Sequence, residues 1–211
     1  MTVKTFIFNP FQENTYLVYD ENKQAIVFDC GIILDYEKKA FDAYIKDNHI
    51  NIVKVLNTHL HLDHQFGNRF LAETYQVKPE AHVEDEFLLD NVKAHGAMFG
   101  IPIKDEPQPI DAYIIDNQEF EVGSMRFKAL HVPGHSPGSV AFYFEEEGCV
   151  FVGDVLFKGS IGRTDLPKGD YATLIRSIQN RLLPLPDSTV IYSGHGPATT
   201  ITEEKANNPY L

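Results

Sequence analysis

The chain has 211 residues and a mass of 23.9 kDa, of which 43% are hydrophobic and 23% charged. This length suits one domain with a buried core, predicted to span residues 1–211. A net charge of −12 without any basic run excludes nucleic acid and anionic membranes as predicted partners. No window has the ~20 apolar residues of a membrane helix. The N-terminus lacks an export signal and the two cysteines are too few for a disulfide framework, which predicts a cytoplasmic protein.

Local patterns divide the chain into alternating groups of strands and helices. Strands are predicted at 4–8, 14–20, 25–29, 52–57, 112–116, 118–122, 125–132, 139–144, 149–153 and 189–193. Helices are predicted at 35–49, 65–75, 84–100, 170–183 and 202–208, and Asp170 is the expected N-cap of the fourth. This order predicts an α/β fold in which sheets pack together with helices outside.

The segment 55–68, "VLNTHLHLDHQFGN", places His59, His61, Asp63 and His64 within six residues. Residues two apart point the same way on an extended chain but do not face each other on a helix. The segment is therefore expected to be a loop at the end of a strand, with a helix beginning after Gly67. Its four groups cannot all reach one tetrahedral ion, so two neighbouring metal ions use them better. A polar loop without metal is the alternative.

Three further ligand-type residues, His135, Asp154 and His195, lie in "HVPGHSPGS", "FVGDVLF" and "YSGHGPA". Each follows a predicted strand and has Gly or Pro beside it, which allows the backbone to bend toward a shared rim. Alone, each is typical of a turn. Together with the segment at 59–64 they predict a metal site.

In this order, "THLHLDH", "PGHSPGS", "GDVLF" and "SGHG" resemble the metallo-β-lactamase superfamily of hydrolases over nearly the whole chain. The resemblance implies a four-layer αβ/βα sandwich with the metals at one edge, between the two sheets. It also divides the seven ligand positions into two sets joined by one carboxylate. The first metal would be held by His59, His61 and His135, and the second by Asp63, His64 and His195, with Asp154 as the bridge.

Such a centre predicts hydrolysis by a metal-bridging hydroxide, because two divalent ions lower the pKa of bound water to about 7 and polarise a carbonyl. Asp63 and Asp154 are the predicted catalytic carboxylates. Ser136 and Ser193 are interpreted as turn residues, not as nucleophiles. We expect two divalent ions per chain, with zinc first and iron or manganese as alternatives, since mixed nitrogen and oxygen ligands accept all three.

The stretch 154–170, "DVLFKGSIGRTDLPKGD", resembles glyoxalase II enzymes, which hydrolyse S-lactoylglutathione and similar acyl thiols. This implies a small-molecule thioester substrate and a role for Arg163 in contacting a glutathione carboxylate. Only residues 196–211 follow His195, where glyoxalase II carries a helical domain that supplies much of its glutathione site. The chain therefore resembles the short, hydroxyacylglutathione hydrolase-like members. Met98 and Phe99 are candidates either for the pocket or for the core.

Two other functions remain open. "GRTD" also resembles persulfide dioxygenases, in which one iron would be held by His59, His135 and Asp154. A non-catalytic metal-binding protein is the alternative of a different class.

The remaining histidines and one cysteine are assigned to support or to the surface. His131 is a candidate for orienting the ligands. Surface or helix-end positions are expected for His49, His82 and His95, and Cys30 is expected to be a small buried residue.

Overall fold

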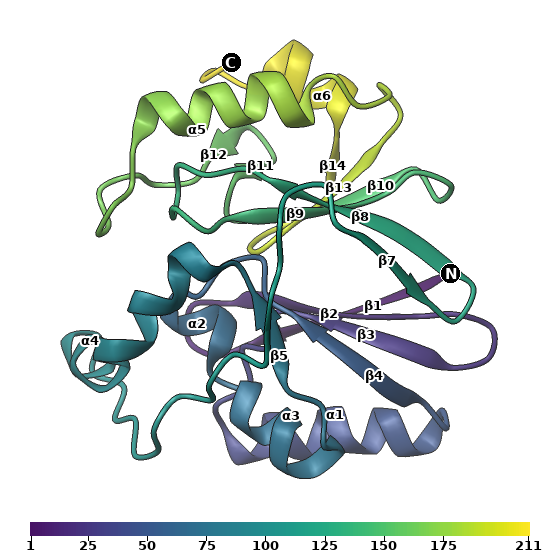
Figure 1. The fold of residues 1–211 in the computed structure, drawn as a ribbon, viewed down its shortest axis with the longest axis vertical. Helices are drawn as coiled ribbons and strands as arrows, with labels where there is room; N and C mark the ends of the chain where they lie inside the picture. Colours follow the sequence, from purple (N-terminus) through teal and green to yellow (C-terminus); the bar gives the residue numbers. More distant parts are fainter.

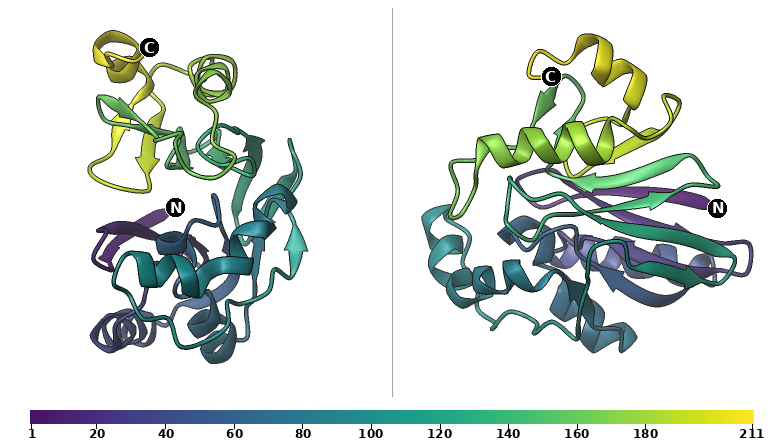
Figure 2. Two further views of the ribbon diagram at one scale, coloured as in Figure 1. Left: turned by 90° about the vertical axis from the view of Figure 1, so that its left-hand side faces the viewer. Right: turned by 45° about the horizontal axis from the view of Figure 1, so that its top comes forward.

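Two six-stranded β-sheets face each other in the computed structural model, which describes residues 1–211. Figure 1 shows helices α1 (Asp35–Asp47) and α3 (Asn68–Tyr75) below one sheet, and α5 (Tyr171–Ser177) and α6 (Ile201–Asn207) above the other. The left view in Figure 2 shows the same succession of helix, sheet, sheet and helix layers. The four-layer αβ/βα sandwich expected from the sequence is therefore present.

The first sheet has the strand order β1-β2-β3-β4-β5-β6. Its strands are β1 (Thr2–Phe8), β2 (Glu13–Tyr19), β3 (Gln24–Phe28), β4 (Asn51–Leu56), β5 (Pro79–Ala81) and β6 (Ala112–Tyr113). The first three pair antiparallel, and β3 to β6 pair parallel. Helix α1 connects β3 to β4, as parallel neighbours require a crossover. The carboxyl ends of β3 and β4 consequently meet at one edge.

The second sheet has the order β14-β13-β10-β9-β8-β7. Its strands are β7 (Glu119–Val122), β8 (Met125–His131), β9 (Val140–Phe144), β10 (Cys149–Gly153), β13 (Val190–Ser193) and β14 (Thr199–Thr200). Its one parallel pair, β10 and β13, is connected through a hairpin of β11 (Leu156–Phe157) and β12 (Ser160–Ile161) and then α5. Asp170 accepts a hydrogen bond from the Thr173 backbone N–H at 2.7 Å, which confirms its predicted role as N-cap of α5.

Three buried clusters hold the layers together. The cluster between the sheets contains 16 residues, with the Phe28 ring 4.6 Å from that of Phe151 and 4.9 Å from that of Phe142. A second cluster joins the first sheet to its helices through Phe41, and a third joins the second sheet to α5 through Leu174. Burying each such side chain stabilises the fold by about 1.5–3 kcal/mol. The two sheet edges that carry the ligand loops are therefore held against each other by packing.

The structure corrects two predictions about local structure. Residues 62–65, expected to be a loop, form the single-turn helix α2 (Leu62–Gln65), while α3 begins after Gly67 as predicted. Gly67 packs closely against Cys30, where a Cβ would lie 2.2 Å from Cys30 Sγ, so this position requires glycine. The helix predicted at 84–100 is a 3₁₀ segment, η1 (Val83–Asn91), followed by α4 (Val92–Met98). Both Asp85 and Leu88 are buried in η1, so side-chain contacts shape this segment.

None of the helices combines the length and apolar character needed to span a bilayer.

Candidate metal centre

All seven predicted ligand residues lie at one edge of the sandwich, in the segments that follow β4, β8, β10 and β13, with Asp63 and His64 in the single turn of α2. The segment after β4 carries four of them, and the other three segments carry one each. Because both sheets present these strand ends at the same edge, residues up to 136 positions apart come together. Six of the seven lie in two groups whose potential ligand atoms are within 4.8 Å of one another: His59, His61 and His135, and Asp63, His64 and His195.

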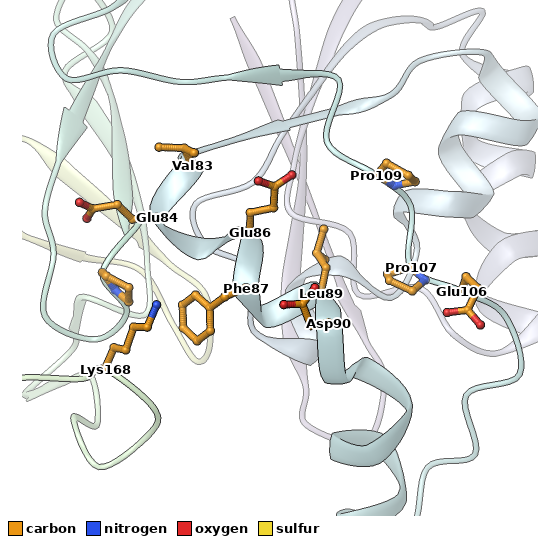
Figure 3. Close-up of a pocket in the computed structure, with 11 residues that line it drawn as sticks. Val83, Glu84, Glu86, Phe87, Leu89, Asp90, Glu106, Pro107, Pro109 and Lys168 are labelled. Carbon is orange, nitrogen blue, oxygen red and sulfur yellow. The ribbon is translucent and has the colours of Figure 1, made fainter.

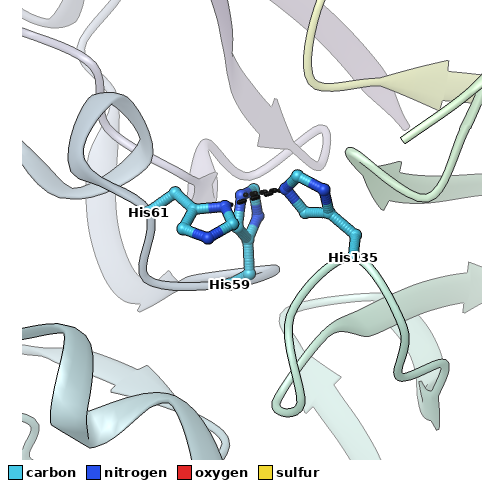
Figure 4. Close-up of side chains that lie close together, drawn as sticks. All are labelled: His59, His61 and His135. Atoms are coloured by element: carbon cyan, nitrogen blue, oxygen red, sulfur yellow. Dashed lines mark hydrogen bonds between the residues drawn. The ribbon is translucent and has the colours of Figure 1, made fainter. Parts of the chain in front are cut away.

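The first group consists of three imidazoles that face one another (Figure 4). His61 Nδ1 lies 2.8 Å from His135 Nε2, and His135 Nε2 lies 3.3 Å from His59 Nε2. Nitrogens bound to one tetrahedral zinc at roughly 2.0–2.1 Å are about 3.3 Å apart. The spacing of the His59 and His135 nitrogens therefore fits a shared metal ion.

Hydrogen bonds behind the rings define which nitrogens carry protons in the first group. His135 Nδ1 lies 2.8 Å from the Arg163 carbonyl oxygen, which can only accept, so Nδ1 carries the proton. The Thr58 hydroxyl donates to Asp29 at 2.7 Å and so accepts from His59 Nδ1, at 3.0 Å. Both Nε2 atoms then direct lone pairs at each other. Two lone pairs this close repel each other, and a cation bound between them would remove the repulsion.

The second group combines a carboxylate with two imidazoles. His195 Nδ1 donates to the Phe11 carbonyl at 3.1 Å, which leaves Nε2 to face Asp63 Oδ2 at 3.2 Å. His64 Nδ1 lies 3.0 Å from Asp29 Oδ2, and its Nε2 lies 3.8 Å from Asp63 Oδ2. Each imidazole is thus oriented from behind, with its Nε2 toward the same carboxylate, as metal-binding histidines are.

Asp154 lies between the two groups. Its Oδ1 is 3.4 Å from His64 Nε2, while its Oδ2 is 3.8 Å from His135 Nε2 and 3.5 Å from His195 Nε2. One carboxylate therefore contacts both groups, which is the position of a bridging ligand. His64 Nε2 and Asp154 Oδ1 are also buried without a hydrogen-bond partner. Such atoms are rare in folded proteins, and here they surround the point where ions would bind.

The charges of the site favour a cation. Burial lowers the pKa of His59 well below its usual value and that of His61 to about 3, so both rings stay neutral and able to bind metal. Burial also acts to lower the pKa of His64, but the carboxylates of Asp154, Asp63 and Asp29 outweigh it and raise that pKa. The three carboxylates around His64 thus stabilise positive charge at the centre.

Asp29 belongs to the site although the sequence patterns did not identify it. It is buried directly after β3, with a φ of 54°. Its carboxylate accepts from the Thr58 N–H and the Thr58 hydroxyl, each at 2.7 Å, and faces His64 Nδ1. It therefore orients His64 directly and His59 through Thr58. The sequence signal that could have identified Asp29 is its position immediately after β3, a strand that pairs parallel with β4.

Asp85 is a second buried carboxylate that the patterns did not identify. It accepts hydrogen bonds from the Leu60 N–H at 3.1 Å, the Ser136 hydroxyl at 2.7 Å and the Gly138 N–H at 2.6 Å. It thereby ties the loop of His59 and His61 to the loop of His135. Burial raises its pKa, although these three donors act to lower it. Nothing distinguishes Asp85 in the acidic run "VEDE" of the sequence.

The remaining polar candidates have structural partners. Ser136 Oγ donates to Asp85, as expected of a turn residue. Ser193 was also expected in a turn, but it is the last residue of strand β13, and its Oγ donates to the Leu156 carbonyl. His131 Nε2 lies 2.8 Å from the Pro137 carbonyl and donates to it, across the loop that carries His135. Its role in orienting that ligand stays a prediction. Cys30 is buried, as predicted.

His82, Glu84 and His131 form a potential ligand group apart from the seven predicted residues. The rings of His82 and His131 stack with centroids 4.2 Å apart and an interplanar angle of 10°. The lone pairs of an imidazole lie in the plane of its ring. Two stacked, nearly parallel rings therefore do not direct their lone pairs at one ion. We therefore place the metal centre at the first two groups alone.

An apolar cavity of about 400 Å³ opens onto the metal centre. Its walls include Phe11, Leu88 and Leu166, and the end of α4 contributes Met98 and Phe99. Phe99 packs edge-to-face on Phe11 with ring centroids 5.3 Å apart. Met98 and Phe99 are 80% and 56% exposed, so they belong to the pocket and not to the core.

His95 lines this cavity from the last turn of α4, which is the helix-end position expected for it, and His49 is exposed as predicted.

Arg163 stands at the same cavity, but its guanidinium already has a partner. Its Nε and Nη2 donate to the two carboxylate oxygens of Asp165, each at 2.7 Å. The predicted contact of Arg163 with a substrate carboxylate stays a prediction.

A larger hollow of about 870 Å³ lies beside η1 (Figure 3). Glu84, Glu86, Asp90 and Glu106 make it acidic, and none of the seven ligand residues lines it. The Lys168 ammonium lies there, 3.7 Å from the centre of the Phe87 ring. The smaller cavity is therefore the one that serves the metal centre.

Fold and site together define a metal-dependent hydrolase. A family model described as the metallo-beta-lactamase superfamily matches residues 8–195, and the chain belongs to that superfamily. The hydroxyacylglutathione hydrolase GloC of Haemophilus influenzae is 38% identical, over 100% of this chain and 98% of its own length. The probable metallo-hydrolase YqgX of Bacillus subtilis is 35% identical, over 96% of this chain and 93% of its own length.

Two solved structures share the fold. One is described as the B3 metallo-beta-lactamase BLEG-1; it is 36% identical, with a TM-score of 0.89 over 100% of this chain and 99% of its own. The other is TTHA1623 in a di-iron-bound form, which is 35% identical, with a TM-score of 0.88 over 99% of this chain and 100% of its own. The predicted family and fold class are thus confirmed.

Proposed function

We propose that this chain is a binuclear metal-dependent thioesterase that hydrolyses small acyl thioesters of the S-lactoylglutathione type. The observation that carries the proposal is the position of Asp154, whose two oxygens contact both ligand groups at the floor of an apolar cavity. Similarity to a hydroxyacylglutathione hydrolase supports the substrate class.

The residues would hold two ions as the superfamily resemblance implied. One set is His59, His61 and His135, the other is Asp63, His64 and His195, and Asp154 belongs to both. Divalent cations at these positions lower the pKa of water to about 7 and polarise a carbonyl oxygen. Zinc suits the mixture of imidazole and carboxylate ligands, and so does iron, which the similar TTHA1623 structure contains.

The protein's own groups supply orientation and a dry environment. The Arg163 and Phe11 carbonyls and Asp29 hold the imidazoles with one nitrogen toward the centre. The apolar walls seat the acyl group and exclude bulk water, which strengthens electrostatic interactions with the reacting carbonyl. Hydrolysis adds a water oxygen to the carbonyl carbon, breaks the C–S bond and releases a carboxylic acid and a thiol. Asp63, which lines the cavity, is placed to receive the proton that water gives up.

The test measures metal content per chain by elemental mass spectrometry and thioester hydrolysis with S-lactoylglutathione, on the same preparation. We expect close to two ions per chain and hydrolysis that a chelator abolishes. A single iron with oxygen uptake on glutathione persulfide would instead support the dioxygenase function. Metal binding without turnover of either substrate would support the non-catalytic function.

A further inference from the structure

Arg163 is the one lysine or arginine side chain that lines the cavity above the metal centre. Its guanidinium is engaged by Asp165 through two parallel hydrogen bonds of 2.7 Å. This bidentate geometry occupies the edge of the guanidinium that would otherwise bind a substrate carboxylate. The Arg163 carbonyl meanwhile accepts from His135 Nδ1, which fixes the backbone beneath the side chain. The only lysine or arginine side chain of the cavity is therefore already paired within the chain.

A substrate carboxylate would have to displace Asp165 from this pair. Asp165 is only two residues from Arg163, so its effective concentration at the guanidinium is on the order of millimolar or higher. The hydrogen bonds from Arg163 also lower the pKa of Asp165 to about 2, so its carboxylate is ionised at every physiological pH. A substrate carboxylate therefore competes with this intramolecular anion, which weakens its binding by up to about fivefold, the range for an exposed ion pair.

No other lysine or arginine lines this cavity. Lys168 lies over the Phe87 ring in the acidic hollow beside η1. The walls of the reactive cavity are instead apolar, with Phe11, Met98 and Phe99 among them. A chain with a net charge of −12 adds no general attraction for an anionic substrate. A neutral, apolar carrier thiol fits this environment better than one with two carboxylates.

We propose that Asp165 is a specificity-determining residue, which withholds Arg163 from substrate carboxylates and so favours acyl thioesters of uncharged thiols over those of glutathione. The inference rests on the proposed thioesterase function.

The experiment compares two lactoyl thioesters that differ only in the carrier thiol, S-lactoylglutathione and S-lactoyl-N-acetylcysteamine, using the full metal-loaded chain. We expect wild type to show at least equal kcat/KM for the N-acetylcysteamine thioester. Asp165→Asn removes the competing charge, so the KM for S-lactoylglutathione should fall about fivefold, the upper end for an exposed ion pair. The KM for the neutral thioester should stay at the wild-type value.

Two further variants make the comparison specific. Adding Arg163→Gln to Asp165→Asn should cancel the gain with S-lactoylglutathione, because the freed guanidinium is then missing. Asp187→Asn removes one surface charge far from the cavity and should leave the ratio of the two KM values unchanged.

The outcomes separate the two proposals. Hydrolysis of both thioesters with a wild-type preference for glutathione, and no response to Asp165→Asn, would overturn the specificity inference alone. Failure of the metal-loaded wild type to hydrolyse either thioester would overturn the thioesterase function as well. Thermal unfolding of Asp165→Asn checks that the fold is intact, as expected for a side chain that is 68% exposed.

Discussion

The floor and the mouth of the cavity are built in opposite ways. At the floor, Asp29 and Asp85 are buried carboxylates that each accept several hydrogen bonds from the ligand loops. At the mouth, the Arg163–Asp165 pair and Met98 are largely exposed to solvent. Buried charge-assisted hydrogen bonds are costly to break, whereas exposed ion pairs contribute about 0–1 kcal/mol and exchange readily.

This difference separates what the floor determines from what the mouth determines. Ligand nitrogens must be held within about 0.5 Å for a metal site to form, which requires the buried network. Discrimination between similar substrates needs only modest differences in binding, which exposed side chains supply. Substitutions at the floor should therefore change metal binding and stability, and substitutions at the mouth should change KM.

The largest effect is expected from Asp154→Asn. The neutral amide removes the charge that faces both ligand groups, so activity should fall by more than about a hundredfold, the upper range for residues that only support ligands. Circular dichroism should show an intact fold, and elemental analysis should show fewer than two ions. A fully active Asp154→Asn protein would contradict the binuclear centre.

The second-largest effect is expected from Asp29→Ala. Without the carboxylate, His64 and Thr58 lose their common acceptor, and metal affinity should fall about 10- to 100-fold. Competition with a chromophoric chelator measures this. Asp29→Asn keeps one oxygen acceptor and should lose less. Equal affinity in wild type and Asp29→Ala would show that the floor does not need this residue.

Asp85→Ala tests whether the floor also stabilises the fold. It leaves the Leu60 N–H, the Gly138 N–H and the Ser136 hydroxyl without their buried acceptor, so the free energy of unfolding should fall by about 1–3 kcal/mol. Urea denaturation measures the change. Glu84→Ala, the substitution of a neighbouring exposed carboxylate, is the matched control and should have little effect.

Metal binding at the floor should also depend on pH. Burial acts to lower the pKa of His64, but Asp154, Asp63 and Asp29 raise it above its usual value, and the bound proton must leave before a cation binds. Affinity should therefore fall about tenfold per pH unit below that raised pKa. Burial holds the pKa of His61 at about 3, so that ring does not compete near neutral pH. Calorimetry at neutral pH in two buffers of different ionisation enthalpy measures the proton release, and its absence would contradict the prediction.

The smallest effect is expected at the mouth. Phe99→Ala removes an aromatic wall and its edge-to-face contact with Phe11, which is worth about 0.5–1.5 kcal/mol beyond burial. The KM for lactoyl thioesters should rise severalfold, by more than kcat falls, while metal content stays at the wild-type value. Loss of metal in Phe99→Ala would show that floor and mouth are not independent.

Local motifs and their order along the chain predicted much of this molecule. Apolar alternation located the strands, and four ligand-type residues between 59 and 64 identified a metal site, because such crowding serves little else. His135, Asp154 and His195 were recognisable because each follows a strand and lies beside glycine or proline. Local propensity did not predict α2 and η1. A single helical turn and a 3₁₀ segment are stabilised by the tertiary contacts of their side chains, which the local sequence does not show.

The sequence by itself determined the α/β class, the superfamily motifs and the seven ligand-type residues, because these depend on residue type and short spacing. Only the tertiary structure decided that Asp29 and Asp85 belong to the site and that Asp165 occupies Arg163. Those contacts, apart from the Arg163–Asp165 pair, join residues dozens of positions apart, and no local pattern records them. Even the neighbouring pair depends on the direction of two exposed side chains, which spacing alone does not define.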